Sequence, residues 1–353
     1  MAKKVIWAVV ILVIVMVAAG WTLNMLGALG VFKALAPHFA GECTPITGVV
    51  GPEDITIHPE TGVAYISSSD RRAAAQGRPA RGAIYAYDLK SETPRLRNLT
   101  PAAAPDFNPH GISLHIDKNG EEALFVVNHQ KGKHTVEIYD LQNGRFSHRR
   151  TLSDPMLISP NDLVAVGRDR FYVSNDHRFG AGFMQRVEDF LQLKLSGVVY
   201  YNGSRFIEAA SGIGYANGIN VSADGKRLYL GSVTEGVLHI YNRDIASGKL
   251  TPRQEIDLST GIDNIEVDPD GGLWIGAHPQ LFKFLQHAKD ASKLSPSQVL
   301  HLIPLADGGY DIKEVFLNGG EKISASSVAA AYGGRLLIGA VFDPKFLDCK
   351  IAP

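Results

Sequence analysis

The stretch ANGINVSADGKRLYLG, residues 216–231, contains the unit from which the chain is built. A polar pair precedes a short apolar strand, and a turn containing glycine leads to a second apolar run. The unit is present six times, at intervals of 46 to 63 residues. The polar pairs are Glu53-Asp54, His110-Gly111, Asn161-Asp162, Asn217-Gly218, Asp263-Asn264 and Ser326-Ser327. Because an interval of this length accommodates a four-stranded blade, the repeat predicts an all-β fold, a six-bladed β-propeller over residues 41–353.

The first strand of each blade lines the central channel of a propeller. Equivalent positions on six first strands therefore converge on one axis, where this chain carries Glu, Asp, Asn and His. Apolar runs with β-branched and aromatic residues predict further strands in the blades. These runs lie at 83–89, 135–141, 197–201, 236–241 and 281–285.

The length and charge of the chain narrow the classes of function. A chain of 353 residues is long enough for one large β domain with a substantial core. The net charge is −1, from 35 basic and 36 acidic residues, so no broad basic face for nucleic acid is expected. The sequence contains no Gly-x-Ser-x-Gly elbow, phosphate loop or dinucleotide fingerprint.

Residues 1–40 differ in composition from the rest of the chain. Seventeen uncharged, mostly apolar residues follow Lys4, and apolar sequence continues to residue 35. A bilayer span needs roughly 20 apolar residues. A cleaved signal peptide ending near Ala18-Ala19-Gly20 is the alternative. The apolar sequence beyond that point favours a retained membrane anchor, and Lys3 and Lys4 favour a propeller on the extracytoplasmic side, periplasmic or extracellular/lumenal.

The two cysteines, Cys43 and Cys349, lie at opposite ends of the predicted propeller. In an exported protein an even number of cysteines favours a disulfide, which here would close the ring. Two unrelated buried thiols are the alternative.

Residues 183–193 interrupt the β pattern. Phe183, Val187, Phe190 and Leu191 share one face of a predicted amphipathic helix. Propensity favours a helix packed on the rim of the propeller, and a lid or membrane-facing helix over the channel mouth is the functional alternative.

The polar pairs offer mainly carboxylate and amide oxygens, which are the donors that calcium prefers. No cysteine and few imidazoles are available there, which argues against zinc. Successive residues of a strand point to opposite faces, so the two members of a pair cannot share a site without a bulge. Two separate calcium ions follow, one on the axis and one beneath it. A single pair is more often only a turn, but pairs in register on five strands favour a metal ring.

Three histidines lie near this ring in the predicted fold. His110 occupies a ring position, and His129 follows the second apolar run of the same blade. Two imidazoles beside a cation can share a proton and raise the basicity of one of them. His278 ends the corresponding run of the fifth blade and faces the channel mouth.

Short motifs recur at the predicted ring and at the ends of the neighbouring strands. The motifs are GPEDI (51–55), FNPHGIS (107–113), VVNH (126–129), NDLVAVG (161–167), NDH (175–177), ANGIN (216–220) and DNI (263–265). Together they resemble the paraoxonase family of calcium-dependent lactonases and arylesterases. The similarity runs from about residue 40 to the C-terminus and includes both cysteines.

The resemblance implies a role for each ring residue. The catalytic calcium would be held by Glu53, Asn161, Asn217, Asp263 and Asn264. The structural calcium would be held by Asp54, Asp162 and the backbone carbonyl of Ile112. His110 and His129 match the catalytic dyad of the family, while Tyr215 and His278 match walls of the substrate pocket. The chain departs from the family in Ala277, where many relatives have cysteine, and in the loop 69–75.

The sequence therefore predicts a calcium-dependent hydrolase of lactones and aryl esters, anchored in a membrane. Its partners would be a small lactone or ester substrate and the lipid bilayer, without nucleic acid. The paired carboxylate positions favour two metals over the single site of a sugar lactonase, and the dyad favours catalysis over a non-catalytic, membrane-tethered propeller.

Overall fold

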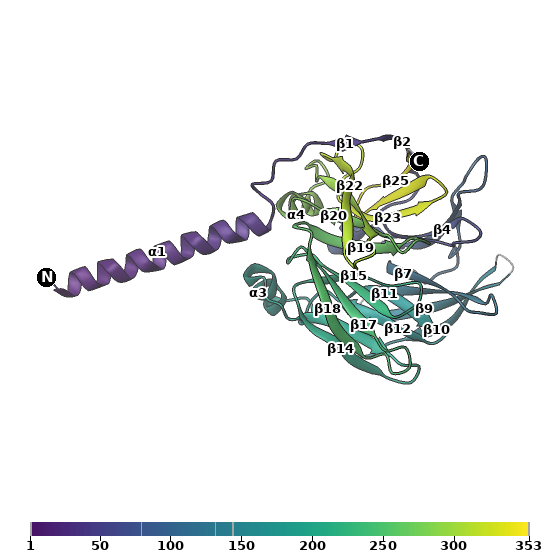
Figure 1. Ribbon diagram of the computed structural model, residues 1–353, viewed down its shortest axis with the longest axis horizontal. Coiled ribbons are helices and arrows are strands. Elements are labelled where there is room, and N and C mark those ends of the chain that lie inside the picture. The colour runs from purple at the N-terminus through teal and green to yellow at the C-terminus, as the bar shows by residue number, and fades with distance from the viewer. Residues whose placement is uncertain (1, 79, 131, 143–144, 352–353) are drawn as a thin grey trace.

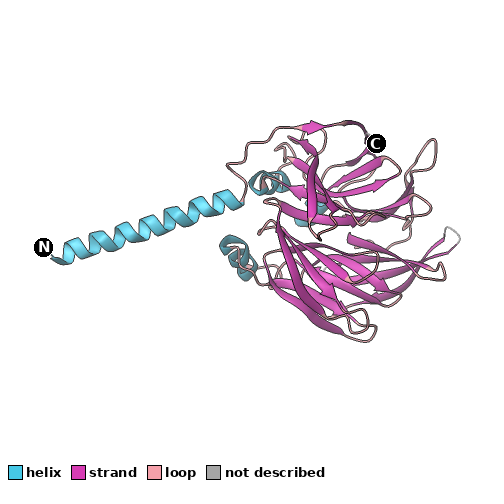
Figure 2. Cartoon of the chain, viewed as in Figure 1, coloured by secondary structure: helices cyan, strands magenta, loops and turns pink. Residues whose placement is uncertain are grey.

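The computed structural model describes residues 2–78, 80–130, 132–142 and 145–351. A long N-terminal helix, α1 (Ala2–Ala28), projects away from a body that consists almost entirely of strands (Figures 1 and 2). The first strands of six sheets follow one another in a closed ring, in the order β3, β7, β11, β15, β19, β23 and back to β3. The six-bladed propeller predicted from the repeat is therefore confirmed.

Each blade is an antiparallel sheet in which the strands follow chain order from the channel outwards. Blade 1 comprises β3 (Pro52–Ile57), β4 (Val63–Ser68), β5 (Ala83–Asp88) and β6 (Arg97–Asn98). Blade 2 comprises β7 (Pro109–Ile116), β8 (Glu122–Gln130), β9 (Lys133–Gln142) and β10 (Arg145–Leu152). Blade 3 comprises β11 (Pro160–Gly167), β12 (Arg170–Asn175), β13 (Ser196–Tyr201) and β14 (Phe206–Ile213). Blade 4 comprises β15 (Ala216–Val221), β16 (Arg227–Ser232), β17 (Val237–Arg243) and β18 (Leu250–Asp257). Blade 5 comprises β19 (Gly261–Val267), β20 (Leu273–His278), β21 (Ser297–Pro304) and β22 (Tyr310–Asn318). Blade 6 comprises β23 (Ser326–Tyr332), β24 (Arg335–Ala340) and β25 (Lys345–Ile351).

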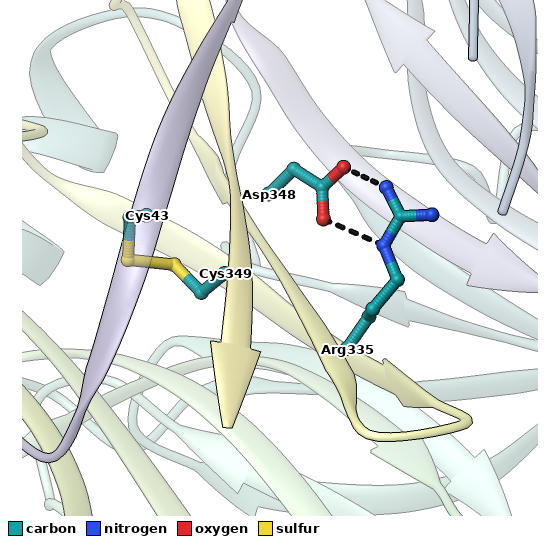
Figure 3. Close-up of a disulfide and its surroundings, with 4 residues drawn as sticks. All are labelled: Cys43, Arg335, Asp348 and Cys349. Atoms are coloured by element: carbon teal, nitrogen blue, oxygen red, sulfur yellow. Dashed lines mark hydrogen bonds and ion pairs between the residues drawn. A yellow bond between two sulfur atoms is a disulfide. The ribbon is translucent and has the colours of Figure 1, made fainter. Parts of the chain in front are cut away.

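The two ends of the propeller sequence meet in blade 6. Strand β2 (Gly41–Thr47) pairs with β25 as the outer strand of this blade, and β1 (His38–Phe39) extends blade 5. Cys43 lies directly opposite Cys349 in the β2–β25 pair, and the predicted disulfide is confirmed (Figure 3). It links residues 306 positions apart, which in the loop-entropy model contributes roughly 5 kcal/mol as an upper value.

An ion pair within blade 6, beside the disulfide, is hydrogen-bonded to blade 1. Arg335 donates from Nε to Oδ1 of Asp348 at 2.9 Å, and a second nitrogen of the same guanidinium binds the other carboxylate oxygen (Figure 3). Tyr87, on β5 of blade 1, donates its hydroxyl to Oδ2 of Asp348 at 2.8 Å. The closure of the ring thus rests on side chains from both neighbouring blades.

Apolar side chains fill the space between neighbouring blades. Ile84, Phe107 and Val126 pack together between blades 1 and 2, and Tyr172, Leu228 and Tyr200 do so between blades 3 and 4. Because both faces of each blade are covered in this way, the strands carry buried residues on successive positions. The channel is then the one place where polar side chains of the first strands meet.

Every first strand is irregular at its polar pair. The register with the second strand shifts at Pro52/Asp54, Pro109/Ile112, Pro160/Leu163, Ala216/Ile219, Ile262/Ile265 and Ser326/Ala329. A β-bulge re-aims side chains and is common beside active sites. Strict alternation would point the two members of a polar pair to opposite faces of the strand, and only a bulge allows both to face inwards. Such a bulge is present at Glu53 and Asp54, and both side chains are buried.

The strand predicted at 281–285 is wrong. Residues Leu281–Lys289 form a helix, α4, and the third strand of blade 5 is β21, further along the chain. A short apolar run alone cannot distinguish a strand from a helix. The loop after β4 also contains a short helix, α2 (Arg71–Ala75), that the sequence analysis did not predict.

The predicted amphipathic helix is present as α3 (Phe183–Leu191), but its orientation is the reverse of a helix packed by its apolar face. Phe183 and Phe190 are 73% and 55% exposed, while Glu188 is 4% exposed. The Glu188 carboxylate faces inwards and accepts the backbone N–H of Arg178 at 3.0 Å. The helix therefore packs through its polar side and presents its apolar side outwards.

Helix α1 satisfies the length and composition requirements of a membrane span, as either a signal anchor or a signal peptide. Its C-terminal part lies beside α3 and α4 (Figure 1). The ring of Trp21 packs on that of Phe190 with centroids 4.8 Å apart. Beyond α1, the carbonyl of Leu29 accepts the backbone N–H of Phe282 at the start of α4.

Candidate active site

Five buried residues from four first strands meet at the channel end where these strands begin; we call them the upper set. They are Glu53, Asn161, Asn217, Asp263 and Asn264. Asn264 donates from Nδ2 to Oε1 of Glu53 at 2.8 Å and to the Glu53 carbonyl at 3.0 Å. Ser327, on the strand between them, donates to the same carbonyl at 2.6 Å. The first strands of blades 1 and 5 are thereby tied together across blade 6.

Four oxygens of the upper set have no hydrogen-bond partner among the described residues. They are Oε2 of Glu53 and the Oδ1 atoms of Asn161, Asn217 and Asn264. A buried acceptor without a donor costs roughly 1–3 kcal/mol, and native proteins contain few of them. Four such oxygens in one ring indicate a cation-binding site, because a cation satisfies acceptors without requiring hydrogen.

An imidazole and a guanidinium approach the Glu53 carboxylate. Nε2 of His110 lies 3.6 Å from Oε2, and a guanidinium nitrogen of Arg71 lies 3.5 Å from the same atom. Burial alone would raise the pKa of Glu53, but His110, Arg71 and the Asn264 hydrogen bond outweigh it and lower the pKa to about 2. The Glu53 side chain is therefore a carboxylate at neutral pH.

Arg71 is a residue that the sequence analysis missed. It is the first residue of α2, and its side chain reaches into the channel to donate to the carbonyls of Gly51 and Pro109 at 3.1 and 3.3 Å. Burial lowers the pKa of the Arg71 guanidinium, while Glu53 acts in the opposite direction. Its only sequence signal was the departure of the loop 69–75 from the family pattern.

Asp263 and His278 form a buried pair at the opposite wall. Nε2 of His278 lies 2.8 Å from Oδ2 of Asp263, and the ring of Phe284 from α4 packs on the imidazole at 4.3 Å. Burial raises the pKa of Asp263, although the bond to His278 counteracts this. His278 therefore lies beside the upper set, as the sequence analysis expected.

Asp54 and Asp162 form a second, separate group, which we call the lower set together with Ile112. Each carboxylate accepts two backbone N–H groups, one from its own successor and one from the next blade. Oδ2 of Asp54 binds N of Ile112 at 2.6 Å, and Oδ2 of Asp162 binds N of Ile219 at 2.8 Å. Burial raises the pKa of both carboxyls well above the usual range, and Asp162 adds to the effect on Asp54.

Two glycines let neighbouring first strands approach one another closely. A Cβ on Gly111 would lie 2.4 Å from Oδ1 of Asp162, and one on Gly218 would lie 2.2 Å from the Asp263 carbonyl. A side chain in place of Gly111 would collide with the Asp162 carboxylate, and one in place of Gly218 would collide with the backbone of β19. This explains why His110 and Asn217 are each followed by glycine.

The histidines of blade 2 form a line of three imidazoles rather than the expected two. Nδ1 of His110 lies 2.8 Å from Nε2 of His129, whose Nδ1 lies 2.8 Å from Nδ1 of His134. His134 is the residue opposite His129 in the β8–β9 hairpin. The sequence HQKGKH (129–134) contained this signal, because a short hairpin brings its two ends together.

Tyr215 forms another wall near the channel mouth. Its ring packs edge-on against that of His177 with centroids 4.8 Å apart. His177 bridges Asp176 at 2.6 Å and Asp189 of α3 at 2.8 Å. Burial disfavours a charged His177, but these two carboxylates raise its pKa to about 10, so an ionic clamp holds α3 over this side of the mouth.

A cavity of about 520 Å³ lies between the end of α1 and the propeller. Gly27 and Ala28 line one side of it, and Thr234, Thr260 and His278, the partner of Asp263, line the other. A second cavity, of about 400 Å³, lies at the far end of the channel against Asp162 and Glu266.

The donors of the upper set fit calcium. Carboxylate and amide oxygens predominate, with the unpartnered oxygens described above, and calcium accepts six to eight such ligands. Within the described residues no group of three His, Cys, Asp or Glu side chains has the arrangement of a metal cluster, and the upper set is instead rich in amide oxygens.

The comparisons with known proteins agree with this geometry. Residues 39–351 match the family model described as Arylesterase. The chain is 36% identical to human (Homo sapiens) serum paraoxonase/arylesterase 1 over 333 residues, covering 92% of both chains. It is 35% identical to serum paraoxonase/arylesterase 2 of Gallus gallus, covering 99% of both.

A solved structure of regucalcin, a calcium-binding protein from Agrobacterium tumefaciens, shares the fold with a TM-score of 0.54. It is 14% identical and covers 90% of this chain and 98% of that chain. Because the family match spans nearly the whole propeller, the chain belongs to the arylesterase (paraoxonase) family and is an enzyme of the arylesterase/lactonase class.

Proposed function

We propose that this chain is a calcium-dependent hydrolase of lactones and aryl esters, with the upper set as the catalytic metal site. The observation that carries the proposal is the ring of four buried oxygens without hydrogen-bond partners. Glu53, Asn161, Asn217, Asp263 and Asn264 would hold the ion. When bound, calcium would supply a Lewis acid that polarises the substrate carbonyl and stabilises the oxyanion.

His110 would act as the general base on this site. Its Nε2 faces Oε2 of Glu53 at 3.6 Å, so a water molecule attacking a nearby carbonyl lies within reach of this nitrogen. Nδ1 of His110 is held by His129, which fixes the orientation of the imidazole. Tyr215 and His278 would form walls of the substrate pocket on the other sides.

The lower set would hold a second, structural calcium. Asp54 and Asp162 are fully buried, and their repulsion is the reason that a cation between them would stabilise the folded chain. The carbonyl of Ile112 would complete the protein ligands. Two calcium ions per chain are therefore proposed.

The enzyme would work at a membrane surface, anchored by α1. Support comes from the outward apolar faces beside it. Exposed apolar residues on and after α3 and α4 are Phe183, Met184, Phe190, Leu191, Leu195, Phe282 and Leu285. Lys3 and Lys4 would remain cytoplasmic, which leaves the propeller on the other side. Flotation of the full chain with neutral liposomes tests this, and Phe183→Ser/Phe190→Ser should weaken any binding that remains after α1 is removed by proteolysis.

The activity is tested by calcium-dependent hydrolysis across three substrate classes: aliphatic lactones, aryl esters and aldonolactones. Activity on the first two that disappears with chelator and returns with calcium is expected. Exclusive hydrolysis of aldonolactones would replace the proposal with a sugar lactonase. Activity unaffected by complete calcium removal, verified by metal analysis, would refute the catalytic metal.

A further inference from the structure

The line of three imidazoles runs from the upper set towards the surface of blade 2. His110 stands beside Glu53 at one end, and His134 lies half-buried next to the exposed Lys133 at the start of β9 at the other. Both contacts within the line are 2.8 Å, the length of a good hydrogen bond between ring nitrogens. The charged groups that act on the line are Arg71 near His129 and Asp176 near His134.

We consider the state in which His110 is neutral and its Nε2 is free to accept a proton. In this state the facing ring nitrogens allow only one tautomer for each of the three imidazoles. Nδ1–H of His110 then donates to Nε2 of His129, and Nδ1–H of His129 donates to Nδ1 of His134. His134 carries its hydrogen on Nε2, which has no hydrogen-bond partner among the described residues. Each ring thus has one donor and one acceptor along the line.

Within the described residues, the hydrogen bond and the ring contact of the His134 side chain are both made to His129. The His134 imidazole is partly exposed, and its single side-chain hydrogen bond within the described part of the chain is the one to His129. The ring of His129 packs on it edge-on with centroids 4.9 Å apart. Burial lowers the pKa of both His129 and His134.

We propose that His134 is the outer member of a proton relay that connects His110 with the surface. The inference rests on the proposed role of His110 as the base. As His110 takes a proton from water at Nε2, it gives its Nδ1 proton to His129. His129 then gives its own Nδ1 proton to His134, and His134 releases the Nε2 proton to solvent. Reversal of the same steps returns a proton to the leaving alkoxide, so the protons balance over one turnover.

The test compares His134→Asn and His134→Ala with wild type, with His148→Asn as a control and His110→Gln as a reference. An asparagine amide can keep the hydrogen bond to His129 but cannot pass a proton. His148 lies on β10 of the same blade, 47% exposed, and binds Glu137 rather than the relay. The full chain is assayed in detergent with calcium, at low buffer concentration, with and without free imidazole.

Both His134 variants should lower kcat about tenfold, less than the 10²–10⁴-fold that a general base contributes directly, with KM and calcium content unchanged. Free imidazole should restore most of the loss, because it can accept the proton from His129. The His148 variant should behave as wild type at every imidazole concentration.

Full kcat in His134→Asn, beside an impaired His110→Gln, would refute the relay while leaving the base intact. A loss in His134→Ala alone, without imidazole rescue, would reduce His134 to a purely structural contact and also refute the relay. Full activity of His110→Gln with calcium still bound would refute the base and the relay together. Thermal unfolding of each variant with calcium identifies any loss of folding. If a variant is partly unfolded, imidazole rescue of its remaining folded fraction decides whether the relay has been interrupted.

Discussion

The upper and lower sets of the channel are built on the same bulged strands, yet their acids are held in different ways. Asp54 and Asp162 of the lower set each accept two backbone N–H groups, and every one of these bonds is 2.6–2.8 Å long. The upper set is held mostly by side chains, and four of its oxygens have no donor. The backbone thus fixes the lower carboxylates, while the upper oxygens are left free to bind a ligand.

We therefore expect the two sets to have different roles. Backbone hydrogen bonds from a neighbouring blade make the lower set part of the propeller framework, so its occupation should affect folding. The upper set faces His110 and Arg71, so its occupation should affect chemistry. The predictions below test this contrast, beginning with the largest effect.

Glu53→Gln should nearly abolish hydrolysis while leaving the fold intact. Removing the carboxylate that faces His110 and Arg71 should weaken binding of the proposed upper calcium, and the loss of its electrostatic stabilisation should cost roughly 10²–10³-fold in kcat. Esterase kinetics and circular dichroism measure the two effects. If the variant lost its structure instead, the upper set would belong to the framework.

Asp54→Asn should abolish most of the stabilisation that calcium gives to the fold. A ligand at a thousandfold excess over its Kd stabilises by about 4 kcal/mol, and this difference should shrink in the variant. Unfolding by denaturant with calcium and with chelator measures it, and Glu53→Gln is the matched control. An unchanged calcium effect on stability would show that the lower set binds no structural ion.

Without calcium, the protein should become more stable as the pH falls from neutral to mildly acidic. The pKa values of Asp54 and Asp162 are raised well above the usual range by burial, so the folded state binds more protons than the unfolded state above about pH 4. The contribution of these two carboxyls to the free energy of unfolding is therefore fully present below their pKa in the unfolded chain. It is lost as the pH rises through their pKa in the folded state.

Calcium should remove this dependence near neutral pH, because it replaces protons between the two carboxylates. Thermal unfolding between pH 5 and 8, with chelator and with calcium, measures both curves. Parallel curves would contradict cation binding at the lower set.

Arg71→Gln should have the smallest effect of these substitutions, and its effect should be limited to the upper set. The guanidinium lies 3.5 Å from Oε2 of Glu53, so it competes electrostatically with a bound cation. Its removal should tighten the weaker of two calcium affinities by about tenfold at most. Calorimetric titration would detect this, and a change in the tighter affinity alone would reverse the assignment of the two sets.

Much of this organisation is readable in the sequence because it depends on local pattern. The six repeats indicate six blades, and the cysteines at 43 and 349 indicate the closure that pairs β2 with β25. The repeats also place the acids and amides of the five pairs near one axis. Periodicity and strand alternation carry this information, and neither requires knowledge of distant contacts.

Other features were misread or missed because they depend on the surroundings. The run at 281–285 becomes helix α4, since a few apolar residues do not specify a strand without a partner. Helix α3 was recognised from its period, but period alone cannot tell which face is buried. Glu188 faces inwards because the backbone N–H of Arg178 is available to it, and His177 clamps Asp189 from the blade.

The sequence by itself determined the six-bladed ring, the helix at its start and the residue types that converge on the axis, because repeats and side-chain chemistry are local properties. The tertiary structure alone decided that Arg71 reaches Glu53 and that His134 continues the line of His110 and His129. It also decided which oxygens remain unpaired. These facts depend on bulges and on contacts between blades, where the distance between two atoms is set by the packing of segments far apart in the chain.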